Sequence, residues 1–223
     1  MGNTKKIGNA TIINIDCMEY MRTLPDKFFD LAVCDPPYFN DYAKKNYTGS
    51  DVSKSGVKRQ TDEIKHWVVP SKSYFKTLRL TSKNQIIWGC NYYAKHIESF
   101  GQIVWDKEND DSTFSKCELA SHSFGIRVDI FRFKWNGMIQ GDMKNKEIRI
   151  HPTQKPVKLY EWILTNYAKP GQTIFDSHMG SGSSAIACNN LGFEYVGCEL
   201  DEDYYNAACE RIAQHARQQR LFA

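Results

Sequence analysis

The stretch Ile174-Phe175-Asp176-Ser177-His178-Met179-Gly180-Ser181-Gly182-Ser183-Ser184-Ala185 is typical of a strand, a tight glycine turn and the start of a helix. Gly180 and Gly182 allow the backbone to approach a ligand closely, and we expect Ser183 or Ser184 to cap the helix. A single Gly-x-Gly fits many dinucleotide sites and is weak evidence alone. No Gly-Lys-Ser/Thr follows, so the turn does not support a phosphate cradle of the P-loop kind.

The next apolar run, Glu194–Glu199, ends in a carboxylate a short distance after the glycine turn. An acidic residue about 20 residues beyond such a turn can hold ribose hydroxyls in nucleotide-binding α/β folds. A solvated glutamate at a strand end is the alternative interpretation. The glycine turn makes that alternative the weaker one.

Strands alternate with helices along most of the chain. The expected strands are Thr11–Ile15, Leu31–Cys34, Gln85–Trp88, Ile103–Trp105, Thr173–Phe175 and Tyr195–Glu199, with strand-like runs around Ser121–Phe133. The expected helices are Met18–Thr23, Ser71–Thr81, Asn91–Phe100, Pro156–Tyr167, Ser183–Leu191 and Asp203–Gln218. This alternation predicts an α/β fold with a doubly wound, mostly parallel, Rossmann-like sheet in one domain, residues 1–223. Such sheets bind ligands at the carboxyl ends of their strands.

One of those strand ends carries Asp35-Pro36-Pro37-Tyr38. The prolines fix two φ angles and remove two N–H donors, so we expect the Asp35 and Pro36 carbonyls to point outward without a local donor. Acceptors beside an aromatic ring suit the exocyclic amine of a planar base, with Tyr38 stacked on the ring. X-Pro-Pro also simply ends strands, so the motif alone leaves both interpretations open.

Composition limits the classes of protein. The chain has 223 residues, enough for a domain with a sizeable core, and its 41% hydrophobic content excludes a largely disordered protein. A net charge of +3 requires any nucleic-acid contact to come from local patches. The seven cysteines form no CxxC pair, which favours reduced thiols in the cytoplasm and no metal. No run is apolar enough for a membrane span, and the start shows no signal-peptide pattern.

Together these motifs resemble the β class of DNA amino-methyltransferases, the N6-adenine and N4-cytosine enzymes that use S-adenosylmethionine. The catalytic motif precedes the glycine turn, which is the permuted order of that class. One departure stands out, because Ser177-His178 follows Asp176 where the family usually carries Pro-Phe, and we expect this to loosen the cofactor pocket. The matching segments cover most of the chain: Ile13–Glu19, Asp35–Tyr38, Ile87–Tyr93, Val104–Lys107, His151-Pro152-Thr153-Gln154-Lys155-Pro156, Asp176–Ser183 and Glu199.

The resemblance implies methyl transfer from S-adenosylmethionine to the N6 amine of a flipped-out adenine in double-stranded DNA, without a metal. It assigns the chemistry to Asp35, Pro36, Pro37 and Tyr38. It places Asp16 near the cofactor adenine, Glu199 on the ribose, and Asp176 with the Gly180–Gly182 backbone beside the methionine part. Lys155 is expected to pair with the cofactor's carboxylate; otherwise it is a surface lysine at a helix start. The full set of expected cofactor-binding residues is Asp16, Asp35, Thr153, Lys155, Asp176, Gly180, Gly182, Ser183 and Glu199.

Two polar, basic segments are the candidates for DNA contact. Residues 39–70 have weak periodicity and interleaved tyrosines, which suits a mobile lid over the target base; a solvated surface insertion is the alternative. Residues 127–150 are the candidate target-recognition region. This region is short, so recognition is brief, shared with the lid, or assisted by a second subunit in a homodimer. The expected DNA-binding residues are Lys44, Lys45, Lys58, Arg59, Arg132 and Lys134.

Three other functions stay open. N4-cytosine methylation is the nearest, although Asp35 favours adenine because serine is common at that position in cytosine enzymes. Methylation of a protein amide or of RNA is disfavoured by the motif order, and a DNA-binding module without catalysis is disfavoured by intact Asp35 and Tyr38. The resemblance also suggests a restriction-modification role, with a cognate endonuclease, in a prokaryotic or phage-infected cell.

Overall fold

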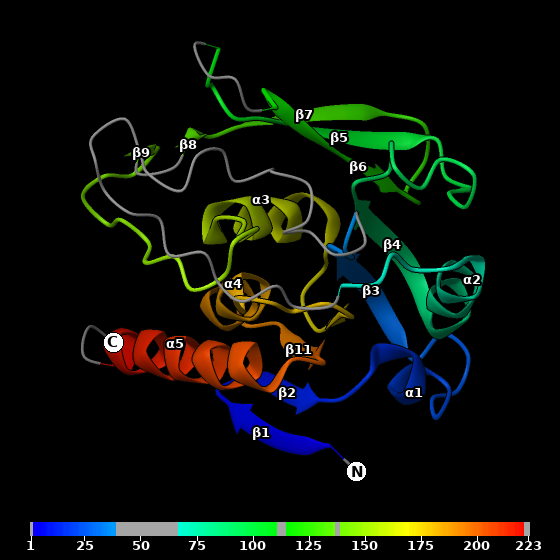
Figure 1. The fold of residues 1–223 in the computed structure, drawn as a ribbon, viewed down its shortest axis with the longest axis horizontal. Helices are drawn as coiled ribbons and strands as arrows, with labels where there is room; N and C mark the ends of the chain where they lie inside the picture. Colours follow the sequence, from blue (N-terminus) through cyan, green and yellow to red (C-terminus); the bar gives the residue numbers. More distant parts are fainter. Residues whose placement is uncertain (1, 39–66, 111–114, 137–138, 221–223) are drawn as a thin grey trace.

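A computed structural model describes residues 2–38, 67–110, 115–136 and 139–220 of the chain (Figure 1). These residues form a nine-stranded sheet, whose strands run in the order β1 (Asn3–Ile7), β2 (Ala10–Asn14), β11 (Glu194–Glu199), β10 (Thr173–Asp176), β3 (Phe29–Cys34), β4 (Ser82–Trp88), β6 (Cys117–His122), β5 (Gly101–Asp106) and β7 (Val128–Arg132). The five strands from β2 to β4 are mutually parallel. A separate two-stranded hairpin pairs β8 (Trp135–Asn136) with β9 (Ile139–Gln140). The predicted mostly parallel α/β sheet is confirmed.

The pairing of β3 with β10 joins segments that are far apart in the chain. Ile174 lies opposite Leu31, and Phe175 lies opposite Ala32. From β3 the chain continues to its neighbour β4 on one side, and from β10 it continues to β11 on the other. The connections therefore leave in opposite directions at this point, which is where open α/β sheets form a ligand crevice.

Helices cover both faces of the sheet. On one face lie α1 (Cys17–Met21) and α2 (Lys72–Thr81), and on the other lie α3 (Val157–Tyr167), α4 (Ser183–Leu191) and α5 (Glu202–Arg220) (Figure 1). Successive β3 residues alternate between the two cores, because Leu31 and Val33 belong to the α3–α5 side and Ala32 and Cys34 to the α1–α2 side. None of the helices in the described part of the chain is long and apolar enough to cross a membrane.

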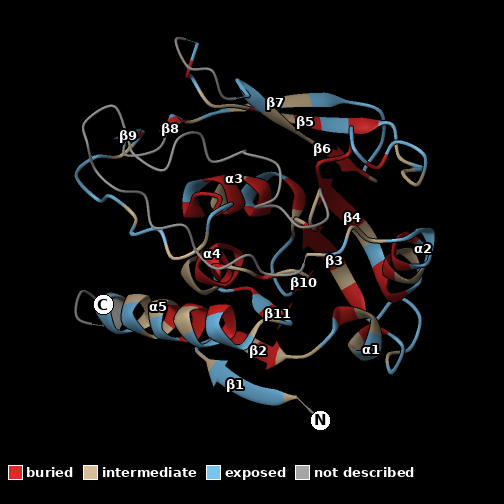
Figure 2. Ribbon diagram, in the orientation of Figure 1, coloured by how far each residue is buried: buried red, intermediate tan, exposed pale blue. Residues whose placement is uncertain are grey.

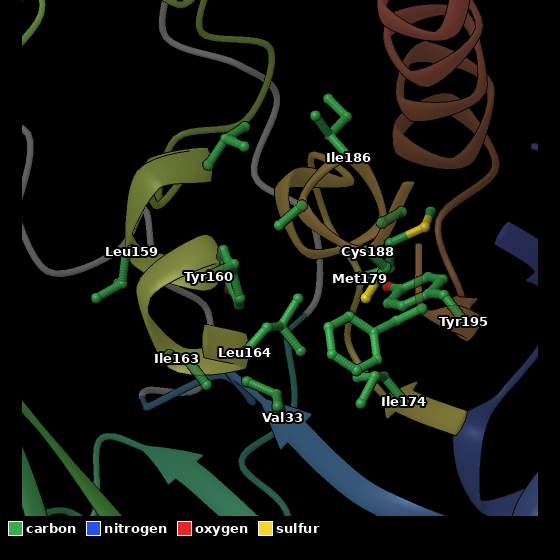
Figure 3. Close-up of a cluster of buried hydrophobic side chains, with 14 of the residues drawn as sticks. Val33, Leu159, Tyr160, Ile163, Leu164, Ile174, Met179, Ile186, Cys188 and Tyr195 are labelled. Atoms are coloured by element: carbon green, nitrogen blue, oxygen red, sulfur yellow. The ribbon is translucent and has the colours of Figure 1, made fainter. Parts of the chain in front are cut away.

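The larger core lies between α3, α4 and the sheet. Leu164 of α3, Ile186 of α4, Ile174 of β10 and Val33 of β3 all belong to this core, and Figure 3 shows Leu164 next to Val33. All four side chains are at most 2% exposed. Figure 2 shows that burial is concentrated in β3, β4, α3 and α4, whereas β1 is largely exposed. Edge strand β1 therefore contributes little to the core.

Two local predictions were wrong, and two elements were not predicted. The expected helix Asn91–Phe100 is absent; short-range turn hydrogen bonds, such as Tyr92 N–H to the Gly89 carbonyl, replace it. Gly182, rather than a serine, is the N-cap of α4, and it makes no side-chain cap bond. Strand β1 and the β8–β9 hairpin were not predicted, because β1 is polar and each hairpin strand has only two residues.

Gly182 fixes the path of the glycine turn into α4. Its φ is +74°, a left-handed conformation that favours glycine. A Cβ at this position would lie 2.7 Å from Ile212 Cδ1 of α5. Gly192, after α4, has nearly the same φ, +76°, but a Cβ there would meet nothing within 4 Å. A substitution at Gly192 therefore introduces backbone strain alone, whereas one at Gly182 introduces both backbone strain and steric crowding.

We expect Gly192→Ala to cost about 1–2 kcal/mol of unfolding free energy through its left-handed backbone alone. Gly182→Ala should cost roughly 1–3 kcal/mol more, because it also crowds a packed core. Urea unfolding of both variants and the unsubstituted protein measures the difference. Equal losses for the two variants would contradict a close approach of the turn to α5.

Candidate active site

A cavity of about 710 Å³ opens at the carboxyl ends of the central strands. This volume lies within the roughly 300–1,000 Å³ typical of small-molecule sites. Four strand ends supply its walls, since Asp16 follows β2, the Asp35–Tyr38 motif follows β3, Gly180 follows β10 and Leu200 follows β11. The segment before α3 adds His151, Thr153, Gln154 and Lys155, and Trp67 and Val68 also line the cavity. The two sequence motifs thus meet in one cavity.

The catalytic motif ends in a closed ring of hydrogen bonds. The Tyr38 hydroxyl donates to Asp35 Oδ1 at 2.5 Å. The ammonium group of Lys155 donates to Asp35 Oδ2 at 2.5 Å and to the Tyr38 hydroxyl oxygen at 3.1 Å. Each carboxylate oxygen therefore has a fixed partner and keeps lone-pair capacity for a further donor.

Lys155 is buried, with its side chain 3% exposed. Besides Asp35 it forms an ion pair with Glu118 of β6, 2.9 Å from Nζ to Oε2. Glu118 in turn pairs with Lys107 at 2.5 Å. The expectation of a surface lysine is wrong, and the carboxylates that Lys155 contacts belong to the protein.

These charges set the ionisation of the motif. Burial raises the pKa of Asp35 above its ordinary value, although Lys155 acts in the opposite direction. Burial also acts to raise the pKa of Glu118, but Lys155 and Lys107 outweigh it and bring the value to about 2. The pKa of Lys155 is raised, because its two carboxylates outweigh the opposing effect of burial. Asp35 is thus the group of this cluster whose charge is easiest to remove.

The Asp35 and Pro36 carbonyls were predicted to point outward without a local donor, but the Pro36 carbonyl has a donor from a distant part of the chain. The Tyr93 hydroxyl donates to the Pro36 carbonyl at 2.9 Å and to the Pro37 carbonyl at 2.5 Å. A carbonyl oxygen has two lone pairs, so Pro36 can still accept a second hydrogen bond from a ligand. Tyr93, the last residue of the matching segment Ile87–Tyr93, thus holds the motif through its hydroxyl, and its side chain is buried at 2% exposure.

Tyr38 lines the cavity, as expected for a ring that stacks on a base. Its ring also stacks on Tyr92, with centroids 5.0 Å apart and an interplanar angle of 15°. Gly89 makes close approach to the same ring possible, since a Cβ there would lie 2.2 Å from the Tyr38 Cε1 atom. The Ile87–Tyr93 segment therefore holds the aromatic side chain of the motif.

Glu199 connects the end of β11 to the glycine turn. Its Oε2 accepts the Gly180 N–H at 2.9 Å, and its Oε1 accepts the Asp201 N–H at 2.9 Å. The carboxylate lines the cavity with spare lone pairs. Burial raises its pKa despite these bonds. This geometry suits the ribose contact expected of Glu199.

Asp16 also lines the cavity, and its Oδ1 accepts the N–H groups of Met18 and Glu19 as the N-cap of α1. The cap holds the residue at the end of β2. Of the nine expected cofactor-binding residues, those that line the cavity are Asp16, Asp35, Thr153, Lys155, Gly180 and Glu199.

The other three expected cofactor-binding residues, Asp176, Gly182 and Ser183, lie behind the cavity wall rather than on it. Asp176 is 1% exposed and accepts the His178 N–H and the Ser184 hydroxyl. Burial raises its pKa to about 7. Ser183 bonds to Arg211 of α5. The side chains of Asp176 and Ser183 therefore support the turn, and a contact of these three residues with the cofactor stays a prediction.

The departure Ser177-His178 fills the cavity wall. Both residues line the cavity, and the Ser177 hydroxyl bonds His178 Nδ1 at 2.9 Å and the Tyr74 hydroxyl at 2.6 Å. Burial lowers the pKa of His178 to about 4, so its imidazole is neutral near pH 7. The hydrogen-bonded imidazole of His178 therefore forms part of the wall, at the position where a loosened cofactor pocket was expected.

Further lining residues escaped sequence reasoning. Cys17, Cys198 and Leu200 adjoin predicted site residues, and their position at strand ends is a signal that could have found them. Tyr160 of α3 also lines the cavity, and no motif marks it; Trp67 does so too, and it lies in the segment 39–70 that was predicted as a lid. Among the described residues, no group of three or more His, Cys, Asp or Glu side chains could hold a metal.

The structure describes only two of the six residues that were predicted to contact DNA. Lys44, Lys45, Lys58 and Arg59 lie outside the described residues, as does most of the predicted lid. Arg132 and Lys134 are exposed, and Arg132 lies 3.6 Å from Asp106. The candidate region 127–150 contains β7 and the β8–β9 hairpin. Its recognition role stays a prediction.

Comparison with known proteins identifies the family. The family model described as DNA methylase matches residues 59–210. The chain is 23% identical to the type II methyltransferase M.HinfI of Haemophilus influenzae, over 91% of this chain and 68% of that protein.

Two solved structures share the fold. The complex of M1.HpyAVI with SAM superposes with a TM-score of 0.56 at 18% identity, covering 91% of this chain and 99% of the other. The cytosine-N4-specific PvuII DNA methyltransferase gives a TM-score of 0.58 at 14% identity, covering 97% and 96%. With the family model spanning most of its length, the chain belongs to the DNA methylase family, the N6-adenine and N4-cytosine amino-methyltransferases.

Proposed function

We propose that this DNA amino-methyltransferase transfers a methyl group from S-adenosylmethionine to the N6 amine of an adenine flipped out of double-stranded DNA. The observation that carries the proposal is the position of the Asp35 carboxylate. It lies in the same cavity as Gly180 and Glu199, the turn that suits a nucleoside. An amine held at Asp35 is therefore next to the space for a methyl donor.

The residues that line the cavity fit this cofactor. Its wall carries several carboxylates, Asp16, Glu199, Asp201 and Glu202 in addition to Asp35. A carboxylate-rich wall favours a cationic ligand, and hydroxyl groups can donate to the spare lone pairs of Glu199. Ile15, Met179 and the neutral His178 provide apolar and flat surface for a nucleobase. M1.HpyAVI, which shares the fold, was solved with SAM bound.

The protein's own task is to align and activate the amine. S-adenosylmethionine supplies a methyl group that its sulfonium sulfur already makes electrophilic. The exocyclic amine is a poor nucleophile, because its lone pair is delocalised into the ring. Asp35 Oδ and the Pro36 carbonyl accept its two N–H groups, which favours a pyramidal nitrogen and frees the lone pair for in-line attack. Tyr38 stacks on the base, and Asp35 accepts the proton released after transfer.

Adenine is proposed over cytosine because the motif starts with Asp35. Serine is common at that position in the cytosine enzymes of the family, so an ionised carboxylate favours the N6 amine. The PvuII enzyme, which shares the fold, is cytosine-N4-specific, and N4-cytosine is therefore the second candidate. A homodimer, a cognate endonuclease and a cytoplasmic location stay predictions, and the type II designation of M.HinfI supports the predicted restriction-modification role.

Incubation with labelled S-adenosylmethionine and unmodified genomic DNA should yield N6-methyladenine, identified by mass spectrometry of the nucleosides. Asp35→Asn should lower the rate about 10²- to 10³-fold, because it removes a preorganised charge at the reacting amine. Asp26→Asn, an exposed aspartate outside the cavity, is the matched control and should leave the rate unchanged. N4-methylcytosine would keep the mechanism and change the base. Cofactor binding with no methylated DNA would contradict the proposal.

Glu199→Gln should weaken S-adenosylmethionine binding roughly 10- to 100-fold, since a hydrogen bond to a charged group contributes about 1.5–3 kcal/mol. Isothermal titration calorimetry measures this without turnover. Glu194→Gln, at the exposed opposite end of β11, is the control. Equal affinities of the two variants would remove Glu199 from the ribose site.

A further inference from the structure

The ammonium group of Lys155 has three oxygen neighbours within 3.1 Å. They are Asp35 Oδ2 at 2.5 Å, Glu118 Oε2 at 2.9 Å and the Tyr38 hydroxyl at 3.1 Å. An ammonium group has three protons to donate. The two hydrogen bonds are to the catalytic motif, and Glu118 is held as an ion pair. Lys155 is therefore committed to the protein's own oxygens before any cofactor binds.

The group is also held in place from the other side. Lys155 Nζ lies 5.4 Å from the centroid of the Trp88 ring, and Trp88 is fully buried. Gln154, the preceding residue, accepts a hydrogen bond at its carbonyl from Trp135 and is 4% exposed. The backbone that carries Lys155 is thus fixed, and a swing of the ammonium toward a cofactor carboxylate would break two contacts with Asp35 and Tyr38.

The charges around Lys155 alternate in sign. Lys107, Glu118, Lys155 and Asp35 follow one another through ion pairs of 2.5, 2.9 and 2.5 Å. The row is balanced only while Lys155 is present, because without it Asp35 and Glu118 would be two buried carboxylates with Lys107, on the far side of Glu118, as the one remaining lysine of the row. Like charges at close range in a dry site favour protonation of one of them. Glu118 keeps Lys107, so Asp35 is the carboxylate that would gain the proton.

We propose that Lys155 is a positioning residue for methyl transfer, which holds the Asp35 carboxylate ionised and oriented toward the target amine, with Glu118 and Lys107 balancing its charge. This inference rests on the proposed function and deepens it. Lys155 touches no reacting atom. It acts through Asp35, which it orients at Oδ2, and through Tyr38, whose hydroxyl it fixes.

The consequence is a pH dependence of known sign. Asp35 is needed as the carboxylate, so activity falls as pH drops through its pKa. Removing Lys155 raises that pKa further, by about one unit or more for a lost opposite charge at contact distance, and the acidic limb of the rate profile moves to higher pH. The other groups that act on Asp35 are Tyr38, Tyr93, Glu118, Tyr160 and Asp176.

The first experiment needs no substrate. Carbon-13 NMR of aspartate-labelled protein, compared with Asp35→Asn, identifies the Asp35 carboxyl and follows its titration. We expect the Asp35 pKa to rise in the order unsubstituted protein, Lys155→Met/Glu118→Gln, Lys155→Met, because the double variant also loses the repelling carboxylate. Lys155→Arg, which keeps the charge, should stay close to the unsubstituted protein. Lys158→Met, an exposed lysine of α3 paired with Glu161, is the matched control.

The second experiment measures turnover and binding separately. Lys155→Met should lower kcat about 100-fold at pH 7, as expected when a charge that preorganises a site is removed, with its acidic limb displaced upward. Its affinity for S-adenosylmethionine in calorimetry should change less than about threefold, because Lys155 is proposed to make no contact with the bound cofactor. The double variant should recover part of kcat.

An unchanged Asp35 pKa in Lys155→Met overturns the proposal, as does a large loss of cofactor affinity with an unmoved acidic limb, which would make Lys155 the partner of the cofactor's carboxylate. If Lys155→Met does not fold, the double variant and Lys155→Arg carry the same comparison. Absence of DNA methylation by the unsubstituted protein would remove the proposed function. The substrate-free titration would still decide whether Lys155 controls Asp35.

Discussion

The parallel pairing of β3 with β10 is the constraint on which the site depends. It sets the strand that ends in Asp35 beside the strand that ends in Asp176 and the glycine turn. Because the chain leaves these strands in opposite directions, no crossover helix of the described residues covers their carboxyl ends. The space left there becomes the cavity. A register shift of one residue would reverse every side chain of β3 and turn Leu31 and Val33 away from their core.

Much of this arrangement could be predicted from the sequence, because its signals are local. Apolar runs alternating with amphipathic ones gave the parallel sheet, and motifs at strand ends gave Asp16, Asp35, Gly180 and Glu199, all of which line the cavity. Tyr160 is contributed to the cavity by α3, and no motif marks it. Its role depends on tertiary packing alone.

A sequence motif identifies a neighbourhood in the fold but not the direction of each side chain, and the glycine turn is an example. Asp176, Gly182 and Ser183 belong to the glycine turn, yet they face α4 and α5. Asp176 accepts two hydrogen bonds inside the turn, and Arg211 joins Ser183 and the Ser181 carbonyl to Glu147. These contacts stiffen the turn, so that Gly180 can meet Glu199. Sequence spacing could not distinguish the residues that bind from those that support.

The sequence motif that contains Lys155 did not give the direction of its side chain either. The burial of this charge also has a cost in stability. Moving an ammonium and two carboxylates out of water is expensive, and well-packed apolar residues of similar volume often give equal or greater stability. A row of four paired charges beneath the motif is therefore poorly explained as a stabilising device. It is better explained by the proposed chemistry, which needs an ionised Asp35 in a site dry enough to raise its pKa. Under that proposal, stability is given up at the position where a carboxylate must stay charged and aimed at a neutral amine.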